Sequence, residues 1–399
     1  MKIDTNSKKI EEILTRGVEE IFVLDDLKEK LNSGKKLRIK LGIDPTGPKI
    51  HIGRAVALRK LREFQNLGHT AVLIVGDFTA QIGDSSDKSE KRPMLNKKEI
   101  KKNLKDYKRQ LGKIINLSQT EFKFNSKWLK KLKFQEIAEL AESFSVQQMS
   151  NRRNFKDRLE KGQDVSLREF LYPLMQGYDS VMVRADVEIG GTDQLFNLKA
   201  GRIIQKKYGE KEQNILTLGM LEGTDGEKMS TTRGNVINIT DEPNEIFGKI
   251  MSLKDELITK YFTLCTSLDL SEIETIKKEI ENKEMNPRDA KIKLAREVVS
   301  IYHDKEKARK AEEYFINTFS KKEIPEDIQT IRASKGEKLS DILLKNGLVS
   351  SVSDFKRLID SGAITNMSNN KKIEDYNYLI TDTSIFKVGK HRFVKIELS

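Results

Sequence analysis

The sequence predicts an α/β fold with a parallel sheet, followed by a helical domain and a small α+β domain. Three observations support this prediction: apolar residues alternate over 37–43, recur at helical spacing over 56–67 and run without interruption over 71–75. Alternation and short continuous apolar runs are typical of strands, whereas a three- to four-residue spacing is typical of an amphipathic helix. Strand, helix and strand in this order form one βαβ unit, the building block of a parallel sheet.

The other elements of the sheet follow along the chain. Two prolines and a glycine within 45–48 interrupt the chain after the first strand, and Gly68 closes the first helix. Further strands are expected at 180–191 and around 215–218, with a helix from Thr192 onward. A Rossmann-like parallel sheet is the best description of this arrangement.

The pattern then changes twice, which predicts three domains. From 243 to about 325 it is helical and highly charged, without a strand signal. We therefore expect a Rossmann-like domain at 1–242 with an inserted helical region at about 88–165, a helical domain at 243–330 and a C-terminal domain at 331–399. In the last domain, a linker at 331–338 is expected to precede two helices that end at glycines, and the alternating segments IFKVG and HRFVKIEL are expected to form a hairpin.

Composition excludes several classes of protein. No stretch approaches the roughly 18 apolar residues of a membrane span, and the N-terminus lacks the apolar core of a secretory signal, so a soluble, cytoplasmic protein is expected. A single cysteine, Cys265, excludes an intramolecular disulfide. Four scattered histidines without a Cys/His cluster argue against a zinc site, and no protein-ligated metal is expected.

The net charge of +12 is unevenly placed. Residues 88–113 contain eleven Lys or Arg against three Asp or Glu. Clustered cations of this kind suit a polyanion, because binding releases counterions from a phosphate backbone. A solvated helix face would give the same pattern.

The loop before the first helix has the residues of a phosphate site. His51 and Gly53 lie where a helix begins at the carboxyl end of a strand. Backbone N–H groups and the positive end of the helix dipole attract phosphate there. The alternative is a histidine that caps its own helix.

A second loop, GDFTAQIGD, follows the strand at 71–75. Asp77 and Asp84 lie in its two Gly-Asp turns and suit an ammonium group, while Lys88 and Arg92 just beyond them suit departing phosphates. Ordinary turn chemistry explains the aspartates equally well.

The segment FLYPLMQGYDS predicts a polar cluster in an apolar wall. Tyr172, Gln176 and Asp179 have spacings of four and three, which places them on one face of a helix expected to begin near Pro173. Polar groups so placed orient a small molecule in its pocket. A polar stripe on an ordinary amphipathic helix is the alternative.

Two later loops add candidates for nucleotide binding. Gly191 lets the backbone approach a ligand closely, and the carboxylate of Asp193 is suited to accept from ribose hydroxyls. Lys228 lies in the Gly/Ser/Thr-rich loop 223–235, where a lysine is more often an ordinary surface residue.

In their order and spacing, the segments IDPTGPKIHIG, GDFTAQIGD, YPLMQGYD, IGGTDQ and EKMSTT closely resemble the class I aminoacyl-tRNA synthetases, and among them the bacterial tyrosyl-tRNA synthetases. The C-terminal segments LSDILLKNGLVSSVSDFKRLIDSGAI and VGKHRFVKI resemble a small RNA-binding domain that these enzymes share with a ribosomal protein. The resemblance covers essentially the whole chain. It implies a tyrosine–tRNA ligase that uses ATP and Mg²⁺ to activate L-tyrosine and transfers it to the 3′ end of tRNA(Tyr), releasing AMP and diphosphate.

The resemblance also assigns roles to residues. It places Asp84, Tyr172 and Gln176 at the ammonium group of tyrosine, Asp179 at the phenol and Gln194 near the carboxylate. The residues implied to act on the phosphates are Thr46, His51, Arg54, Lys88, Lys228 and Thr232. The residues implied to hold ATP or the adenylate are Gly42, Asp44, His51, Gly53, Gly191, Asp193 and Lys228. The residues implied to contact tRNA are Arg92, Lys356 and Arg357.

Three positions depart from the family pattern. Lys40 stands where the better-studied branch has a tyrosine that shares the phenol, so the second partner of the phenol stays open. Thr231 stands where the KMSKS-like loop usually has a second lysine. Arg54 replaces a second histidine, and we expect its guanidinium to donate to ribose or phosphate with a longer reach and a permanent charge.

The resemblance further implies a homodimer and no DNA partner. The Phe-rich segment from about Phe122 to Phe155, expected to be helical, suits the dimer interface, and the basic stretch 88–113 suits the tRNA acceptor end. Two alternatives are a non-catalytic RNA-binding protein on a synthetase scaffold, and a different adenylate-forming enzyme such as a tryptophanyl relative or a nucleotidyltransferase. The first would need neither Asp84 nor Tyr172, and Asp179 together with the RNA-binding tail argues against the second.

Overall fold

The structure is a computed structural model that describes residues 2–84, 95–230, 233–320, 328–369, 371–389 and 392–398. The chain divides into two compact units. The first comprises 1–241 and 249–304, and the second comprises 242–248 and 305–399. Each unit is described by itself.

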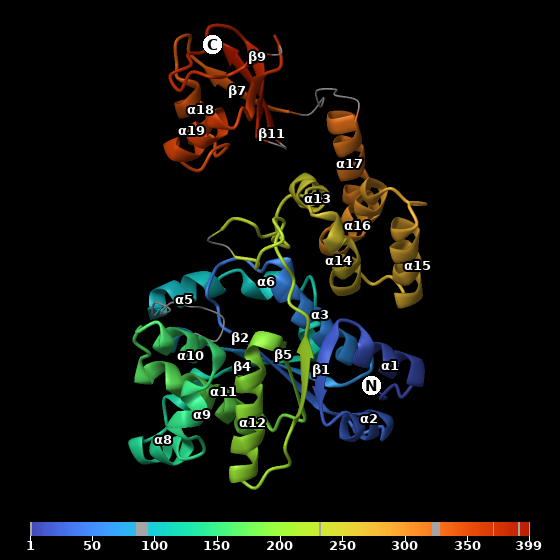
Figure 1. The fold of residues 1–399 in the computed structure, drawn as a ribbon, viewed down its shortest axis with the longest axis vertical. Coiled ribbons are helices and arrows are strands. Elements are labelled where there is room, and N and C mark those ends of the chain that lie inside the picture. The colour runs from blue at the N-terminus through green and yellow to red at the C-terminus, as the bar shows by residue number, and fades with distance from the viewer. Residues whose placement is uncertain are drawn as a thin grey trace. The chain divides into compact units, whose positions relative to one another are not determined.

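A six-stranded sheet forms the centre of the first unit, in the order β1-β6-β5-β2-β3-β4 (Figure 1). Five strands are parallel and β1 runs antiparallel to β6, which confirms the predicted α/β class with a Rossmann-like sheet. The strands are β1 Val18–Phe22, β2 Arg38–Ile43, β3 Thr70–Val75, β4 Thr120–Phe124, β5 Val187–Gly191 and β6 Asn214–Leu218.

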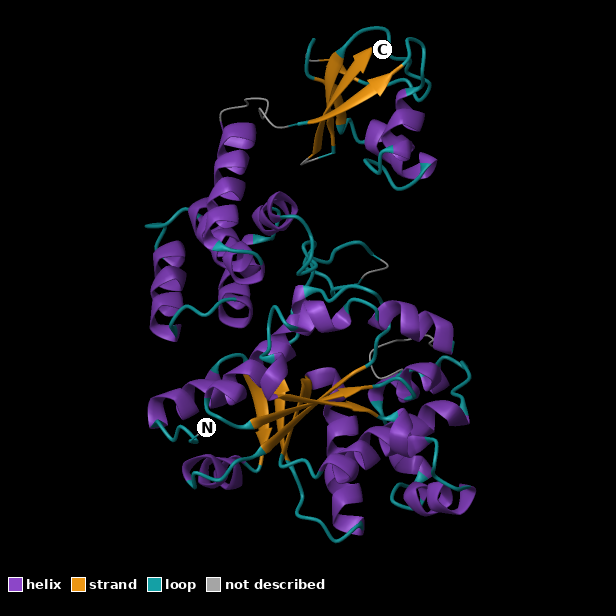
Figure 2. Ribbon diagram, turned by 180° about the vertical axis from the view of Figure 1, so that it is seen from behind, coloured by secondary structure: helices purple, strands orange, loops and turns teal. Residues whose placement is uncertain are grey.

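Helices cover both faces of this sheet (Figure 2). The helices within 2–241 are α1 Ser7–Thr15, α2 Leu24–Asn32, α3 Ile52–Asn66, α4 Thr79–Ile82, α5 Lys97–Leu104, α6 Tyr107–Leu111, α7 Ser126–Leu129, α8 Phe134–Ala141, α9 Val146–Ser150, α10 Arg153–Glu160, α11 Leu167–Val183 and α12 Leu195–Lys207. The predicted first βαβ unit is confirmed as β2, α3 and β3. Its closing glycine, Gly68, has a φ of 96°, a conformation that favours glycine.

The segment 180–191 was predicted wrongly as one strand. Residues 180–183 are the last turn of α11, and the strand β5 begins only at Val187. An apolar run such as SVMV fits a buried helix face as well as a strand, so periodicity alone did not separate them. Pro173 also lies inside α11 and not at its start, because Ser166 and Glu169 form a capping box that begins the helix earlier.

A group of helices follows the sheet along the chain. They are α13 Pro243–Met251, α14 Ile258–Cys265, α15 Leu270–Glu281, α16 Pro287–Tyr302 and α17 Lys305–Phe315. The predicted helical character is confirmed. Residues 249–304 belong to the same compact unit as the sheet, and the division of the chain into three domains stays a prediction.

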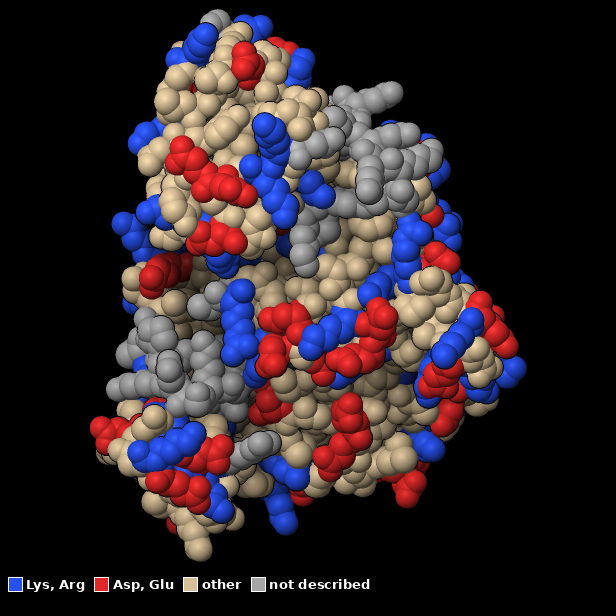
Figure 3. Space-filling model, turned by 45° about the horizontal axis from the view of Figure 1, so that its top comes forward, with Lys and Arg blue, Asp and Glu red and all other residues tan. Residues whose placement is uncertain are grey.

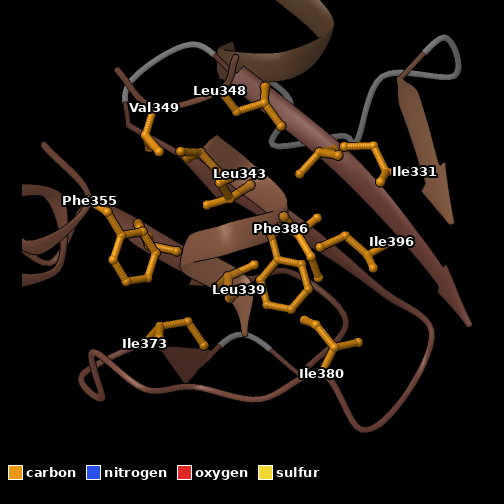
Figure 4. Close-up of a cluster of buried hydrophobic side chains, with 14 of the residues drawn as sticks. Ile331, Leu339, Leu343, Leu348, Val349, Phe355, Ile373, Ile380, Phe386 and Ile396 are labelled. Atoms are coloured by element: carbon orange, nitrogen blue, oxygen red, sulfur yellow. The ribbon is translucent and has the colours of Figure 1, made fainter. Parts of the chain in front are cut away.

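The C-terminal part of the second unit is a small α+β structure. Its helices are α18 Leu339–Lys345 and α19 Val352–Asp360, and its strands are β7 Gln329–Ala333, β8 Ile364–Asn366, β9 Lys371–Lys372, β10 Ser384–Val388 and β11 Arg392–Leu398. Strands β10 and β11 form the predicted antiparallel hairpin. Leu343, Phe355 and Phe386 meet in its buried core (Figure 4).

Two other expectations about local structure are wrong. Residues 331–333 of the predicted linker belong to β7, which pairs in parallel with β11. The segment from Phe122 to Phe155 is not helical throughout, because Thr120–Phe124 forms β4 at the edge of the large sheet. Both strands pair with partners that are distant in sequence, and local patterns carry little information on such pairing. Within the described ranges, no helix is long and apolar enough to cross a membrane.

Candidate active site

A cavity of about 770 Å³ opens above the carboxyl ends of the parallel strands in the first unit. This edge is where open α/β sheets bind ligands. Its walls come from β2, β3 and β5, the loops after them, α11 and the loop around Lys228. The predicted residues that line it are Gly42, Asp44, Thr46, His51, Gly53, Arg54, Asp84, Tyr172, Gln176, Asp179, Gly191, Asp193, Gln194 and Lys228.

His51 lies at the N-terminus of α3 but does not cap the helix with its side chain. The alternative role as a cap is therefore wrong. Its Nδ1 atom is buried and has no hydrogen-bond partner among the described residues. Burial, together with the nearby Arg54 charge, lowers the pKa of His51 to about 3. The imidazole is therefore neutral at physiological pH, and His51 lines the cavity with an uncharged ring.

Arg54 is held in place beside this histidine. Its guanidinium donates to the Thr46 hydroxyl and, at 3.1 Å, to the phenol oxygen of Tyr107. Two further residues of α5 and α6 fix the backbone of the loop, because Asn103 donates to Pro45 O and Gln110 donates to Pro48 O, each at 2.8 Å. The helices of the basic stretch thus support the loop that the sequence assigns to phosphate.

Tyr172 reaches from α11 to the end of β2. Its hydroxyl donates to Asp44 Oδ2 at 2.9 Å, and Asp44 Oδ1 accepts from the Thr79 hydroxyl at 2.7 Å. Burial and the Asp44 charge raise the pKa of Tyr172 well above its usual value, so it stays a neutral donor. Gly76 lies so close to this pair that an added Cβ would be 1.9 Å from Asp44 Oδ1. Only glycine fits there.

A second chain of hydrogen bonds crosses the cavity. Gln194 donates to Asp84 Oδ2 at 2.8 Å and accepts from Asn197 Nδ2 at 2.9 Å. Asn197 in turn accepts from Arg152 at 3.2 Å. Asp84 and Gln194, the residues implied to contact the ammonium group and the carboxylate of the amino acid, are thus in direct contact.

Asp179 is buried at the bottom of the cavity. Its Oδ1 accepts from Trp128 Nε1 at 2.7 Å and its Oδ2 accepts from Asn125 Nδ2 at 3.3 Å. Burial raises the pKa of Asp179 to about 7, while the Lys40 charge and the hydrogen bonds from Trp128 and Asn125 lower it. The carboxyl group is therefore poised between its neutral and ionised forms near neutral pH.

Lys40 and Glu188 form an ion pair below the cavity, with 2.9 Å between Nζ and Oε1. Gln176 donates to the same Oε1 at 3.0 Å. The amide of Gln176, predicted to bind the ammonium group, therefore also joins α11 to β5.

Lys228 and Asp193 meet at the mouth of the cavity, with 3.7 Å between Nζ and Oδ2. The loop that carries Lys228 is anchored by Asn235, whose amide bonds to Asp225 and to the backbone at Lys228 and Ser230. The structure thus brings the lysine next to the predicted ribose ligand.

The other residues named from the sequence fall into two groups. Lys88, Arg92, Thr231 and Thr232 lie outside the described residues. Lys356 and Arg357 are on α19 in the second unit. Lys356 Nζ lies 5.8 Å from the centre of the Tyr376 ring, and Arg357 pairs with Asp354 at 2.7 Å.

Five residues at the site were not predicted from the sequence: Thr79, Tyr107, Asn125, Trp128 and Glu188. Asn125 directly follows β4, the neighbour of β3. A polar residue at the end of a strand, followed three positions later by the single tryptophan of the chain, was a usable signal.

Basic residues show no single patch on the face drawn in Figure 3, where Lys and Arg are interspersed with Asp and Glu. In the described part of the basic stretch, Lys97, Lys98, Lys101 and Lys102 are exposed on α5. They remain available to a polyanion.

Comparisons with known proteins agree with this geometry. Residues 32–320 match the model of the family described as class I tRNA synthetases (W and Y). The chain is 45% identical to a tyrosine–tRNA ligase of Carboxydothermus hydrogenoformans, covering 99% of both chains, and 44% identical to one of Thermotoga maritima, covering 96% of both. A solved tyrosyl-tRNA synthetase of Archaeoglobus fulgidus, complexed with L-tyrosine, has a similar fold, with a TM-score of 0.61, 21% identity and coverage of 77% of this chain and 100% of that chain.

Proposed function

Because the chain belongs to the W and Y family of class I tRNA synthetases and is a tyrosine–tRNA ligase, we propose that its cavity is the place where ATP and L-tyrosine react. The observation that carries this assignment is the burial of Asp179 below a cavity that His51, Arg54 and Lys228 line. An acceptor for a phenol and donors for a triphosphate thus share one space.

The first step is an attack of the tyrosine carboxylate on the α-phosphate of ATP, which forms tyrosyl-adenylate and releases diphosphate. The carboxylate is ionised at neutral pH, so the step needs no general base. Catalysis then depends on positioning and on the stabilisation of charge on the phosphate oxygens. In the second step, the terminal adenosine hydroxyl of the tRNA attacks the adenylate, and AMP leaves.

We assign the amino acid to the inner part of the cavity. Asp84, Tyr172 and Gln176 hold the ammonium group, Gln194 lies near the carboxylate and Asp179 accepts from the phenol. Phenylalanine would leave the Asp179 carboxylate without this partner, an effect for which tyrosyl-tRNA synthetases are themselves the standard illustration. Lys40 is not the second contact of the phenol, because its three ammonium protons are donated to Gln176 O, Ser180 Oγ and Glu188 Oε1.

We assign the nucleotide to the outer part. Gly42 leaves open space on the cavity side, since an added Cβ there would meet no atom within 4 Å. An adenylate can therefore approach the backbone of β2 closely. Asp193 is partly exposed beside Lys228 and is placed to accept from ribose hydroxyls.

Magnesium is part of the proposal. Within the described residues, no three acidic, His or Cys side chains gather as a cation site. Mg²⁺ at phosphoryl-transfer sites takes most of its ligands from phosphates and water, with one or two carboxylates. The cation would therefore be held mainly by the ATP phosphates and water, and it would neutralise charge on those phosphates.

The role of Arg54 is tested by two substitutions. Arg54→Ala is expected to raise the KM for ATP by about tenfold or more, because a charge-assisted hydrogen bond contributes about 1.5–3 kcal/mol. Arg54→His is expected to recover part of this loss. Tyr107→Phe removes one partner that holds the guanidinium and is expected to have a smaller effect. An unchanged ATP dependence in Arg54→Ala would exclude Arg54 from the nucleotide site.

A homodimer is also proposed. Large apolar side chains are exposed on the consecutive helices α8 to α11, among them Phe134 at 88%, Val146 at 73% and Leu167 at 79% exposure. We infer that a second copy of the chain covers these side chains, because large apolar side chains this exposed are unfavourable in water. Leu167 begins α11, the helix that carries Tyr172 and Asp179, so the proposed interface lies next to the tyrosine pocket.

Leu167→Asp is expected to convert the dimer to a monomer and to lower tyrosine activation, because a buried charge at an apolar interface is unfavourable. Sedimentation velocity measures the state of association. Leu24→Asp, a substitution of an exposed leucine on α2, is the matched control and should leave the dimer intact. A Leu167→Asp protein that sediments as a dimer would contradict the proposed interface.

The complete reaction requires tRNA(Tyr). We propose that the exposed lysines of the basic stretch grip its acceptor end, and that Lys356 and Arg357 on α19 contact the RNA elsewhere. A cytoplasmic location stays a prediction. Charging of tRNA(Tyr) with labelled tyrosine, with formation of AMP, tests the whole function, and charging with labelled tryptophan in its place would overturn it.

A further inference from the structure

Lys40 is a fully buried cation in the middle of β2, with 0% of its side chain exposed. Its Nζ donates to Gln176 O at 2.8 Å and to Ser180 Oγ at 2.7 Å, and it lies 2.9 Å from Glu188 Oε1. An ammonium group has three protons to donate, and these three acceptors use them all. Lys40 therefore has no proton left for a substrate, although its side chain lies beside the cavity.

The partners of Lys40 lie on both sides of Asp179 on α11. Gln176 precedes Asp179 by three residues, and Ser180 follows it directly. Glu188 closes the network from β5, because it accepts from Gln176 Nε2 at 3.0 Å and from the Ser180 hydroxyl at 3.2 Å. The ion pair thus links the turn of α11 that carries Asp179 to both β2 and β5.

The charges around Asp179 come from three elements. Burial raises the pKa of Asp179, Lys40 on β2 is the strongest of the influences that lower it, and Glu188 on β5 raises it. The Asp179 charge in turn raises the pKa of Tyr172 on the same helix. Trp128 and Asn125 contribute uncharged hydrogen-bond donors. Loss of the Lys40 charge would therefore favour the neutral carboxyl group.

We propose that Lys40 is a specificity-determining positioning residue, which with Glu188 fixes the turn of α11 and keeps the Asp179 carboxylate ionised as the acceptor for the substrate phenol. The inference rests on the proposed function, since Asp179 must be the partner of the phenol. When the phenol is missing, as with phenylalanine, a buried carboxylate that loses its hydrogen-bond partner costs more free energy than a buried neutral carboxyl group does. Protonation of Asp179 therefore weakens the preference for tyrosine over phenylalanine.

The test is the pH dependence of kcat/KM for tyrosine in ATP–pyrophosphate exchange between pH 5 and 8.5. This quantity reports ionisation in the enzyme before tyrosine binds. Below its pKa Asp179 is protonated, so activity falls on the acid side with a midpoint near pH 7 in the wild type. Saturating MgATP is used throughout, so titration of the nucleotide is common to all variants.

Three variants shift this midpoint in defined directions. Lys40→Met is expected to raise it by about one pH unit and to lower the ratio of tyrosine to phenylalanine activation at pH 7 about fivefold, because the ionised fraction of Asp179 would fall from about one half to about one tenth. Glu188→Gln leaves the lysine charge unopposed and is expected to lower the midpoint. The double variant Lys40→Met/Glu188→Gln leaves no unpaired buried charge, so it is the safest to fold, and it is expected to shift the midpoint in the same direction as Lys40→Met.

Lys60→Met is the matched control. Lys60 is also a buried lysine, paired with Glu63 at 2.6 Å, but it does not line the cavity. It should leave the midpoint and the preference for tyrosine unchanged. A soluble double variant with the wild-type midpoint, or shifts of Lys40→Met and Glu188→Gln in the same direction, would overturn the inference. Failure of the proposed function has a different signature, because the wild type would then lack tyrosine-dependent exchange at every pH.

Discussion

Replacement of Asp179 by Asn is expected to lower kcat/KM for tyrosine in pyrophosphate exchange by about 10²- to 10³-fold, a loss of about 3–4 kcal/mol. The amide has nearly the shape of the carboxylate but lacks its charge. It also brings an N–H group to a position where Trp128 Nε1 already donates at 2.7 Å. The phenol of the substrate then loses a charged acceptor, and one buried donor is left mispaired.

Asp179→Asn should change the kinetic parameters for the amino acid and not those for ATP. The KM for ATP should stay close to the wild-type value, because no part of the nucleotide is assigned to Asp179. Discrimination against phenylalanine should fall in the same variant. Asp289→Asn, a substitution of an exposed aspartate in the first turn of α16, is the control and should change neither quantity. Robust use of tyrosine by Asp179→Asn would refute the assignment of the phenol.

Replacement of Lys228 by Ala is expected to lower kcat for exchange by about 10²- to 10³-fold, while the KM for tyrosine changes little. A cation that acts on the phosphates stabilises charge mainly in the transition state, and loss of one such donor has effects of this size. The ion pair of Lys228 with Asp193 at 3.7 Å places the lysine at the mouth of the cavity. Stopped-flow or quenched measurements of a single turnover give the rate of adenylate formation directly.

A control for Lys228→Ala is Lys278→Ala. Lys278 is exposed on α15 and lies 3.9 Å from Glu274, so it shares the charge of Lys228 but not its position. Its removal should leave the single-turnover rate unchanged. Should Lys228→Ala form adenylate at the wild-type rate, the loop 223–235 would have no part in phosphate chemistry.

Local patterns in the sequence were sufficient to predict the strands and helices that carry the proposed ligand-binding residues. The periods of β2, α3 and β3 were distinct, and the spacing of Tyr172 and Asp179 placed both on the cavity side of α11. The polar character of these residues in an apolar helix was already a signal. These features depend on neighbours in the chain, which is why they could be predicted.

Features that depend on strand order could not be predicted in the same way. Asn125 and Trp128 meet Asp179 because β4 pairs with β3, and no local pattern specifies that pairing. Lys40 is another case, since an isolated lysine in a strand predicts exposure. Its burial becomes favourable only because Glu188 on β5, far along the chain, supplies the opposite charge.

Selection of tyrosine by its phenol in the inner cavity is tested by pyrophosphate exchange of the wild-type enzyme, run in parallel with tyrosine, phenylalanine and tryptophan. We expect strong exchange with tyrosine at pH 7.5, very weak exchange with phenylalanine and none with tryptophan. Exchange of similar strength with tyrosine and phenylalanine, or stronger exchange with tryptophan, would contradict it.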